Sequence, residues 1–501
     1  MATRRLLALA LVIMPAPALA EAPLSAIDWL SRSITAPVAP ASPPERPEGG
    51  TSAPLPDAPI VDAAGLLTPR QTGLPRNLWG NGDPHEIAAQ ITAMQANSIP
   101  ALEELSMNLL LTESRPPGGG DDGLVFFARM DKLLALGALD QAQALLDAAG
   151  ASGLQAFRRQ FDIALLQGTE DRACEVLDAA PQLAPTYPAR IFCLARSGDW
   201  PAAVVVLHTA QALSLVTPEE DALISRFLDP DLFEGEPPLP PPARPTPLEW
   251  RMFEAIGQPL PTYTLPLAFA HAELRVSSGW KAQLDAAERL ARAGVLDPNQ
   301  LLGLYTLQRP AASGGVWDRV AAVQALDQAV SAADVQAVEQ ALPIAWDRMT
   351  HAEIEVPFAR IYASQLLALP LTGDAARLAF RLGLVAGLYA EAAAERTAPN
   401  AEDDFLLALA QGDPVHATAG DALSRAIAEG FRDHAAPSEV EPLLAQQRTG
   451  EAVMLAMDHL SRGASGDLRA VTEGLATLRV VGLQTAARRV ALQLMILERQ
   501  G

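Results

Sequence analysis

Aromatic residues are scarce in this 501-residue sequence. Phe, Trp and Tyr together make up 5 % of it, whereas 49 % of the residues are hydrophobic, and alanine and leucine dominate. Alanine and leucine are strong helix formers, and the shortage of aromatic residues argues against a protein built on β-sheets. We therefore expect an all-α fold, in a chain long enough for two or three domains with their own cores.

Lysine is almost absent, and positive charge is in deficit. Lys132 and Lys281 are the only lysines, so arginine carries nearly all of the positive charge, a usage typical of a GC-rich bacterial genome. The net charge is −22, and it becomes −24 if Arg4 and Arg5 leave with an N-terminal signal. A strongly acidic surface repels nucleic acids and anionic lipid head groups, so we expect neither as a partner.

Catalytic and ligand-binding motifs are also missing. The seven histidines are scattered, and no two of them have the spacing of a zinc site on one helical face. The sequence has no G-x-S-x-G elbow, no S-x-x-K pair and no glycine loop of the nucleotide-binding type. We expect a protein that is not an enzyme and uses no cofactor or metal. Carboxylate pairs leave little trace in a sequence and keep the enzymatic alternative open.

Residues 1–20 have the pattern of a secretory signal peptide. A basic start at Arg4 and Arg5 precedes an apolar run over residues 6–14 and a small-residue ending at residues 18–20. The run is shorter than the roughly 20 residues of a membrane span. We expect cleavage before Glu21, export to the periplasm, and no membrane span in the mature chain.

Residues 21–34 follow as a short amphipathic segment. One side of its helical wheel holds the apolar residues Ala26, Ile27, Trp29, Leu30 and Ile34, and the other side is polar. So short a segment cannot maintain a helix alone in water, so it needs a surface to lie on. Two roles stay open: a cap on the protein's own helices, or a docking helix that binds a partner, with Trp29 as its anchor.

Proline divides the rest of the chain. Residues 35–82 are a proline-rich linker that we expect to be largely disordered, and a second proline-rich connector covers residues 231–246. Residues 83–230 are then a predicted domain of helical repeats, and residues 247–501 a predicted second domain of helical hairpins. The two together predict an α-solenoid preceded by a disordered proline-rich segment.

Three turns recur at nearly constant spacing in the first predicted domain. Their glycines are Gly137, Gly168 and Gly198. Counted from these glycines, the same residue types repeat five, nine and twelve positions on: Ala142, Ala173 and Ala203; Leu146, Leu177 and Leu207; Ala149, Ala180 and Ala210. Glycine permits the reversal between two helices, alanine lets them approach closely, and leucine fills the seam.

This pattern, over about residues 120–215, resembles the tetratricopeptide repeat, whose usual period is slightly longer at about 34 residues. The resemblance implies an α-solenoid in which the first helix of each pair lines a concave groove that receives peptides. It places in that groove Phe127, Asp131, Arg158, Asp162, Phe192 and Arg196. For each of them the alternative is a core residue or a solvated charge.

The chain has two cysteines, Cys174 and Cys193. Their spacing along the chain would place them on neighbouring helices of the repeats, and the predicted compartment permits disulfides. The alternative is that both are small buried apolar residues.

These observations predict a periplasmic scaffold or adaptor that binds protein partners of the cell envelope through its solenoid surface and its N-terminal segment. Two other functions stay open. One is an accessory part of a trans-envelope machine, such as a flagellar motor or a secretion system. The other is a peptidoglycan-binding or lytic-transglycosylase-like protein. The sequence does not determine the oligomeric state.

Overall fold

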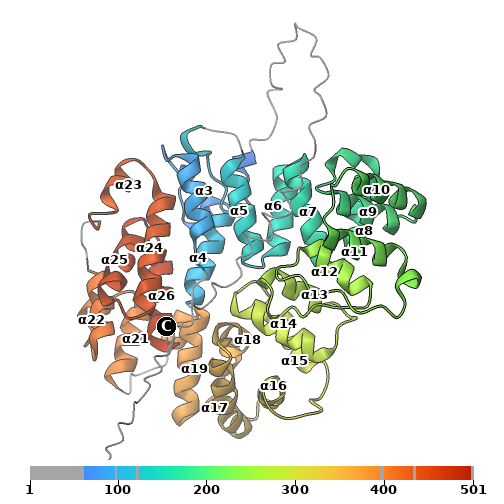
Figure 1. The fold of residues 1–501 in the computed structure, drawn as a ribbon. Coiled ribbons are helices and arrows are strands. Elements are labelled where there is room, and N and C mark those ends of the chain that lie inside the picture. The colour runs from blue at the N-terminus through green and yellow to red at the C-terminus, as the bar shows by residue number, and fades with distance from the viewer. Residues whose placement is uncertain (1–60, 96–98, 120–122, 395–399, 433–435, 498–501) are drawn as a thin grey trace, which may run out of the picture.

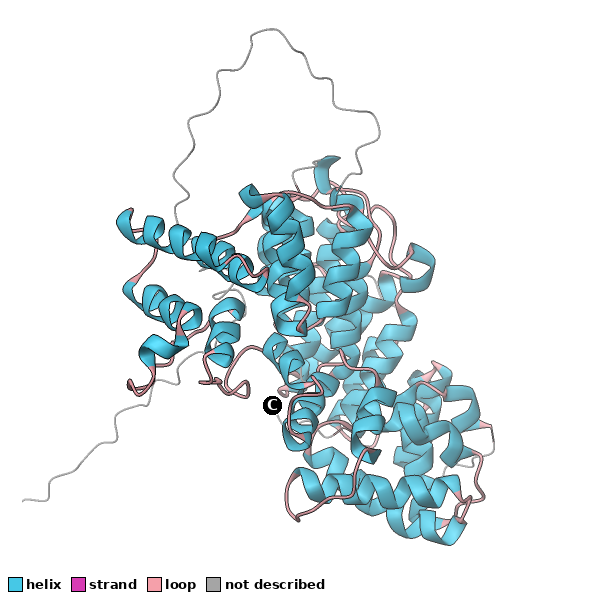
Figure 2. Cartoon of the chain, turned by 90° about the vertical axis from the view of Figure 1, so that its right-hand side faces the viewer, coloured by secondary structure: helices cyan, strands magenta, loops and turns pink. Residues whose placement is uncertain are grey.

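A computed structural model describes residues 61–95, 99–119, 123–394, 400–432 and 436–497. Regular structure in these residues is helical, apart from one isolated β-bridge between Leu67 and Thr112 (Figure 2). The expectation of an all-α fold is therefore confirmed. The predicted signal peptide, the amphipathic segment with Trp29 and Leu30, and linker residues 35–60 lie outside the described residues.

The helices follow one another with short connections. The first half contains α2 (Pro69–Thr72), α3 (Pro84–Ala93), α4 (Pro100–Leu111), α5 (Leu124–Ala135), α6 (Leu139–Ala149), α7 (Leu154–Gln167), α8 (Glu170–Ala179), α9 (Tyr187–Arg196), α10 (Trp200–Ala212), α11 (Pro218–Leu228) and α12 (Pro247–Ala255). The second half contains α13 (Ala270–Glu273), α14 (Trp280–Arg292), α15 (Pro298–Thr306), α16 (Val316–Ser331), α17 (Val335–His351), α18 (Glu355–Leu367), α19 (Gly373–Ala386), α20 (Tyr389–Ala393), α21 (Ala401–Gln411), α22 (Ala422–Gly430), α23 (Glu441–Ala445), α24 (Thr449–Ala464), α25 (Leu468–Val480) and α26 (Gln484–Ile496). Short 3-10 turns are η1 (Val61–Ala63), η2 (Pro117–Gly119), η3 (Pro181–Leu183), η4 (Pro230–Phe233), η5 (Leu267–Phe269) and η6 (Pro414–His416).

Consecutive helices pack as hairpins, including α5 with α6, α7 with α8, and α9 with α10. Gly137, Gly168 and Gly198 lie in the turns of these three hairpins with φ of 75°, 76° and 84°, a left-handed conformation that a side chain disfavours. The repeated alanines and leucines lie in the seams, where all are buried except Ala180, which is half-buried at the end of α8. The spacing of the three glycines therefore predicted these three hairpins correctly.

The two ends of the described chain pack against each other (Figure 1). The last helix, α26, contacts α4 as well as α19 and α21, and α24 contacts α3 and α4. The Glu104 carboxylate on α4 accepts hydrogen bonds from Arg360 on α18, at 2.7 Å, and from Arg489 on α26. The succession of hairpins therefore closes on itself, where an open solenoid would leave its two ends apart.

The predicted linker is shorter than the sequence indicated, because residues 61–82 pack on the body. Leu74, Leu78 and Trp79 are at most 2 % exposed and belong to the main core. The backbone carbonyl of Leu78 accepts a hydrogen bond from the Gly450 N–H at 2.8 Å. The prolines of this segment favour an extended chain, but burying these three large apolar side chains stabilises the packed conformation more strongly.

The proline-rich connector at 231–246 does not separate two cores. Leu248, Met252 and Phe253 of α12 share one cluster with residues of α7, α9 and α11. Beyond it, the His271 imidazole Nε2 lies 2.6 Å from the carbonyl oxygen of Gly137 in the first repeat turn. One larger cluster then runs from Leu74 to Leu497. The connector lies on the surface of a continuous body.

Candidate functional site

An open groove of about 880 Å³ runs over the first helices of the repeat region. Its walls come from α3, α5 and α7, and its lining includes Leu124, Phe127, Asp131, Gln155 and Arg159. The structure therefore places the predicted residues Phe127 and Asp131 together in a groove. Both project from α5, four residues apart and so on one face of that helix.

The cation of this groove is Arg159, which the sequence analysis did not select. Its guanidinium donates two parallel hydrogen bonds to the Asp131 carboxylate, at 2.6 and 2.7 Å. The same guanidinium lies over the ring of Phe127, 4.6 Å from its centre. A paired guanidinium that also stacks on an aromatic ring is held in one orientation. Asp131, Arg159 and Phe127 thus form a preorganised polar and aromatic wall.

Arg158 points into a separate, smaller cavity of about 70 Å³, together with Asp162. This cavity lies among α7, α9, α11 and α12, and Phe161, Leu223 and Ile224 supply part of its apolar lining. Arg158 and Asp162 are only 4 % and 5 % exposed. Arg158 Nε and Asp162 Oδ2 have no hydrogen-bond partner there, so each is a buried polar group facing a small space.

Burial raises the pKa of Asp162 to about 7, and Arg158 and Arg159 oppose that rise only in part. Burial also lowers the pKa of Arg158. Two further carboxylates, Glu220 and Glu249, line the same cavity. Burial raises the pKa of Glu220 as well, so the cavity disfavours negative charge.

Phe192 does not line a groove. It is 1 % exposed and stacks on Phe227, with its ring centre 5.5 Å away, while its edge faces Phe161 at 6.5 Å. The residue spacing predicts which face of α9 carries Phe192. It does not predict that α11 packs on α9 and covers that face. The placement of Phe192 in the groove is therefore corrected to the core.

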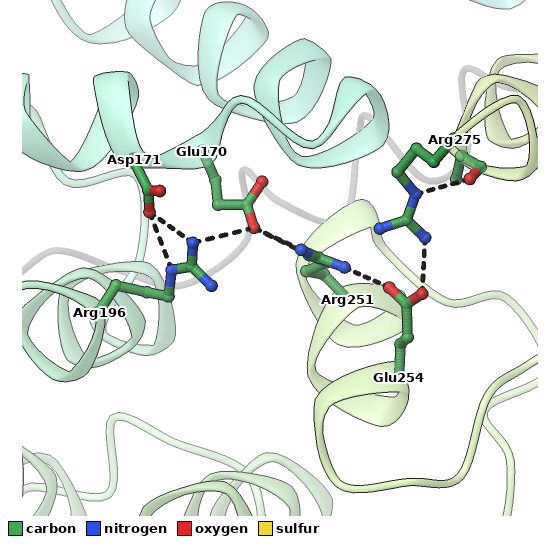
Figure 3. A network of polar contacts seen from close by, with 7 residues as sticks. Glu170, Asp171, Arg196, Arg251, Glu254 and Arg275 are labelled. Atoms are coloured by element: carbon green, nitrogen blue, oxygen red, sulfur yellow. Dashed lines mark hydrogen bonds and ion pairs between the residues drawn. The ribbon is translucent and has the colours of Figure 1, made fainter. Parts of the chain in front are cut away.

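Arg196 is likewise engaged within the molecule (Figure 3). Its guanidinium binds Asp171 at 2.5 Å and lies 3.5 Å from the buried Glu170 carboxylate. Glu170 also accepts a hydrogen bond from Arg251 of α12 at 2.7 Å. Arg251 pairs further with Glu254, so Arg196 belongs to a network that joins α8, α9 and α12. The placement of Arg196 in the groove is corrected accordingly.

This network continues from Glu254 to Arg275, whose guanidinium binds the Glu254 carboxylate at 2.6 Å (Figure 3). Arg275 also donates to the carbonyl of Ala272 at 2.6 Å. The contacts therefore extend from α8 to the chain just after α13, across the proline-rich connector. Glu170 is the buried member, with a side chain that is 1 % exposed, and it has Arg196 and Arg251 as neighbours of opposite charge, which a buried carboxylate needs to be tolerated.

Cys174 and Cys193 form a disulfide that joins α8 to α9. Both residues are at most 2 % exposed, inside the cluster that contains Phe161 and Phe192. The bridge lies between two hairpins, so it fixes the position of the second against the third.

Within the described residues, no group of three or more potential metal ligands comes together, and none of the helices there is long and apolar enough to cross a membrane. Comparison of the chain with protein-family models, with curated proteins and with solved structures finds no match.

Proposed function

We propose that this protein is a non-enzymatic scaffold or adaptor of the bacterial cell envelope. Its groove between α3, α5 and α7 would hold a helical or extended segment of a partner protein. The observation that carries this proposal is the wall formed by Phe127, Asp131 and Arg159 in an open groove of about 880 Å³. An aromatic side chain beside oriented polar groups is the usual composition of a protein-binding surface.

The lining of the groove favours a partner segment with an apolar ridge. Asp131 and Arg159 neutralise each other, so this pair attracts neither sign of charge strongly. Leu124 and Phe127 are half-buried and offer apolar surface, as do the alanines of α3. Apolar side chains of the partner supply most of the free energy of binding, and contacts to Asp131, whose side chain is 27 % exposed, set its register.

Two features of the chain outside the groove support the proposed compartment. The signal-like residues 1–20 support export, and a disulfide between Cys174 and Cys193 suits an oxidising compartment such as the periplasm. The amphipathic residues 21–34 would provide a second contact, as a docking helix that binds a partner.

Site-specific photo-crosslinking in cells tests the proposal. A photoreactive residue replaces Ala89 or Gln155, both exposed and lining the groove, and in a control it replaces Val276, which is 98 % exposed and lies elsewhere. We expect the same partner to be captured from both groove positions and not from Val276. Equal capture at all three positions, or none in the groove, contradicts the proposal.

Substitutions sharpen the test. Phe127→Ala should reduce capture from Ala89 about tenfold, because it removes the largest apolar contact of the groove. The control Leu232→Ala, at a side chain that is 71 % exposed on η4, should leave capture unchanged.

A further inference from the structure

A second groove, of about 410 Å³, lies where the two ends of the chain meet. It lies between the C-terminal end of α3 and the helices α23 and α24. We call it the seam groove. Its apolar lining residues are Ala93, Met94, Leu443, Met454, Leu455 and Met457. This surface differs from the α3–α5–α7 groove, which it borders at Ala93.

The charged groups at the rim of the seam groove already have partners. Arg448 binds the Glu451 carboxylate at 2.5 Å, and Gln90 donates to the same carboxylate at 3.2 Å. Asp458 pairs with Arg462 at 3.3 Å. What the groove offers is therefore mainly apolar surface. Its lining includes the half-buried Met94 and the buried Met454 and Met457, and the flexible thioether side chain of methionine adapts to varied shapes. Such surfaces bind amphipathic helices.

We propose that residues 25–34 of the same chain occupy the seam groove, with Trp29 and Leu30 inserted between α3 and α24. The segment matches the groove in kind: one side of its helical wheel is apolar apart from Ser33, and Asp28 and Arg32 on the other side cancel in charge. A neutral, apolar segment adds no repulsion to a chain whose net charge is −22.

The length of chain before the described residues permits this contact. Asp62 fixes the start of the body, since its carboxylate accepts hydrogen bonds from the N–H groups of Gly123 and Phe126, at 3.1 and 2.7 Å. Residues 35–60 lie between the segment and Val61. A proline-rich chain of this length reaches up to about 80 Å, at about 3.1 Å per residue, far more than the width of α3 and α5.

Tethering also favours the protein's own segment over a free partner. A tether of this length holds its ligand at an effective concentration of the order of millimolar, so even weak apolar contact is largely occupied. The segment then covers the junction of α3 with α24 and contributes to closing the chain on itself. It acts as a cap that a stronger partner can displace.

Cysteine crosslinking of the mature full-length chain tests this cap. Cys174 and Cys193 are bound to each other, so introduced cysteines supply the free thiols. Ala26→Cys is combined with Ala93→Cys or with Ser461→Cys, two lining positions whose preference reports the direction of the segment. The control combines Ala26→Cys with Ala212→Cys on α10, an exposed position near the exposed apolar side chains Val205 and Leu213.

Under a mild oxidant, we expect an intrachain crosslink to one groove position at least about tenfold faster than to position 212. Adding Trp29→Ser should remove most of that advantage, and Trp29→Phe should retain it. Equal rates at all positions, or crosslinks that form only between two molecules, overturn the proposal. Ser461 lies outside the α3–α5–α7 groove, so the pair of Ala26→Cys with Ser461→Cys lets this proposal and the proposed function fail separately.

Discussion

The side-chain carbonyl of Gln493 accepts a hydrogen bond from the backbone N–H of Ala101 at 2.7 Å, across 392 residues of chain. Ala101 lies in the first turn of α4, where backbone N–H groups have no partner within the helix. Gln493, on α26, is 1 % exposed. The last helix of the described chain therefore caps one of the first.

Gln493→Ala should destabilise the protein by about 1–3 kcal/mol, because it leaves the buried N–H of Ala101 without an acceptor. Chemical denaturation measures the loss. Gln484→Ala, at an exposed position of the same helix, should change stability by less than about 0.5 kcal/mol. Equal effects of the two substitutions would show that the contact between chain ends contributes nothing.

Gly450→Ala should be destabilising by about 1–3 kcal/mol, although alanine favours a helix. A methyl group at this position of α24 would lie 2.5 Å from the ring of Trp79, which is buried. Gly303→Ala is the matched control, since it is also helical and nothing lies within 4 Å of the added atom. We expect the control to gain up to about 1 kcal/mol in thermal unfolding experiments.

Asp162→Asn should make stability less dependent on pH. The pKa of Asp162 in the folded protein is about 7, above its ordinary value of 3.8, because the side chain is buried. Between these values the folded state holds a proton that the unfolded state has lost, so stability falls as the pH rises from about 4 to about 7. The slope from this group is at most about 1.4 kcal/mol per pH unit.

Denaturation of the wild type and of Asp162→Asn at several pH values measures this contribution as the difference between them. Arg158, Arg159, Asp131, Glu220 and Glu249 surround the site and are present in both proteins. If the two proteins differ in free energy of unfolding by the same amount at every pH from 4 to 7, the raised pKa of Asp162 is contradicted.

Reducing the Cys174–Cys193 disulfide should lower the free energy of unfolding by about 3 kcal/mol, because a loop of this length is constrained in the unfolded chain. The measurement is denaturation with and without reductant. In a Cys174→Ala, Cys193→Ala variant the reductant should have no effect. A wild type that is insensitive to complete reduction would argue against any stabilising role.

The repeat spacing predicted the positions of the hairpins correctly, but it predicted the residues of the groove only in part. Phe127 and Asp131 lie in a groove, whereas Phe192 is in the core and Arg196 is in an ionic network. Arg158 and Asp162 share a small cavity of their own. Two neighbouring arginines, Arg158 and Arg159, differ by about 100° around α7, and only the packing of α5, α9 and α11 decides which of them meets Asp131.

By itself the sequence determined that the described chain is helical, where its repeat turns are and which small residues fill the seams. These properties depend on local propensity and on the periodicity of apolar residues, which act over a few turns of helix. Tertiary structure alone decided that α26 caps α4, that Trp79 belongs to the core and that no core boundary falls at residues 231–246. Those contacts join residues far apart along the chain, and their positions follow from the accumulated packing angles of every hairpin between them.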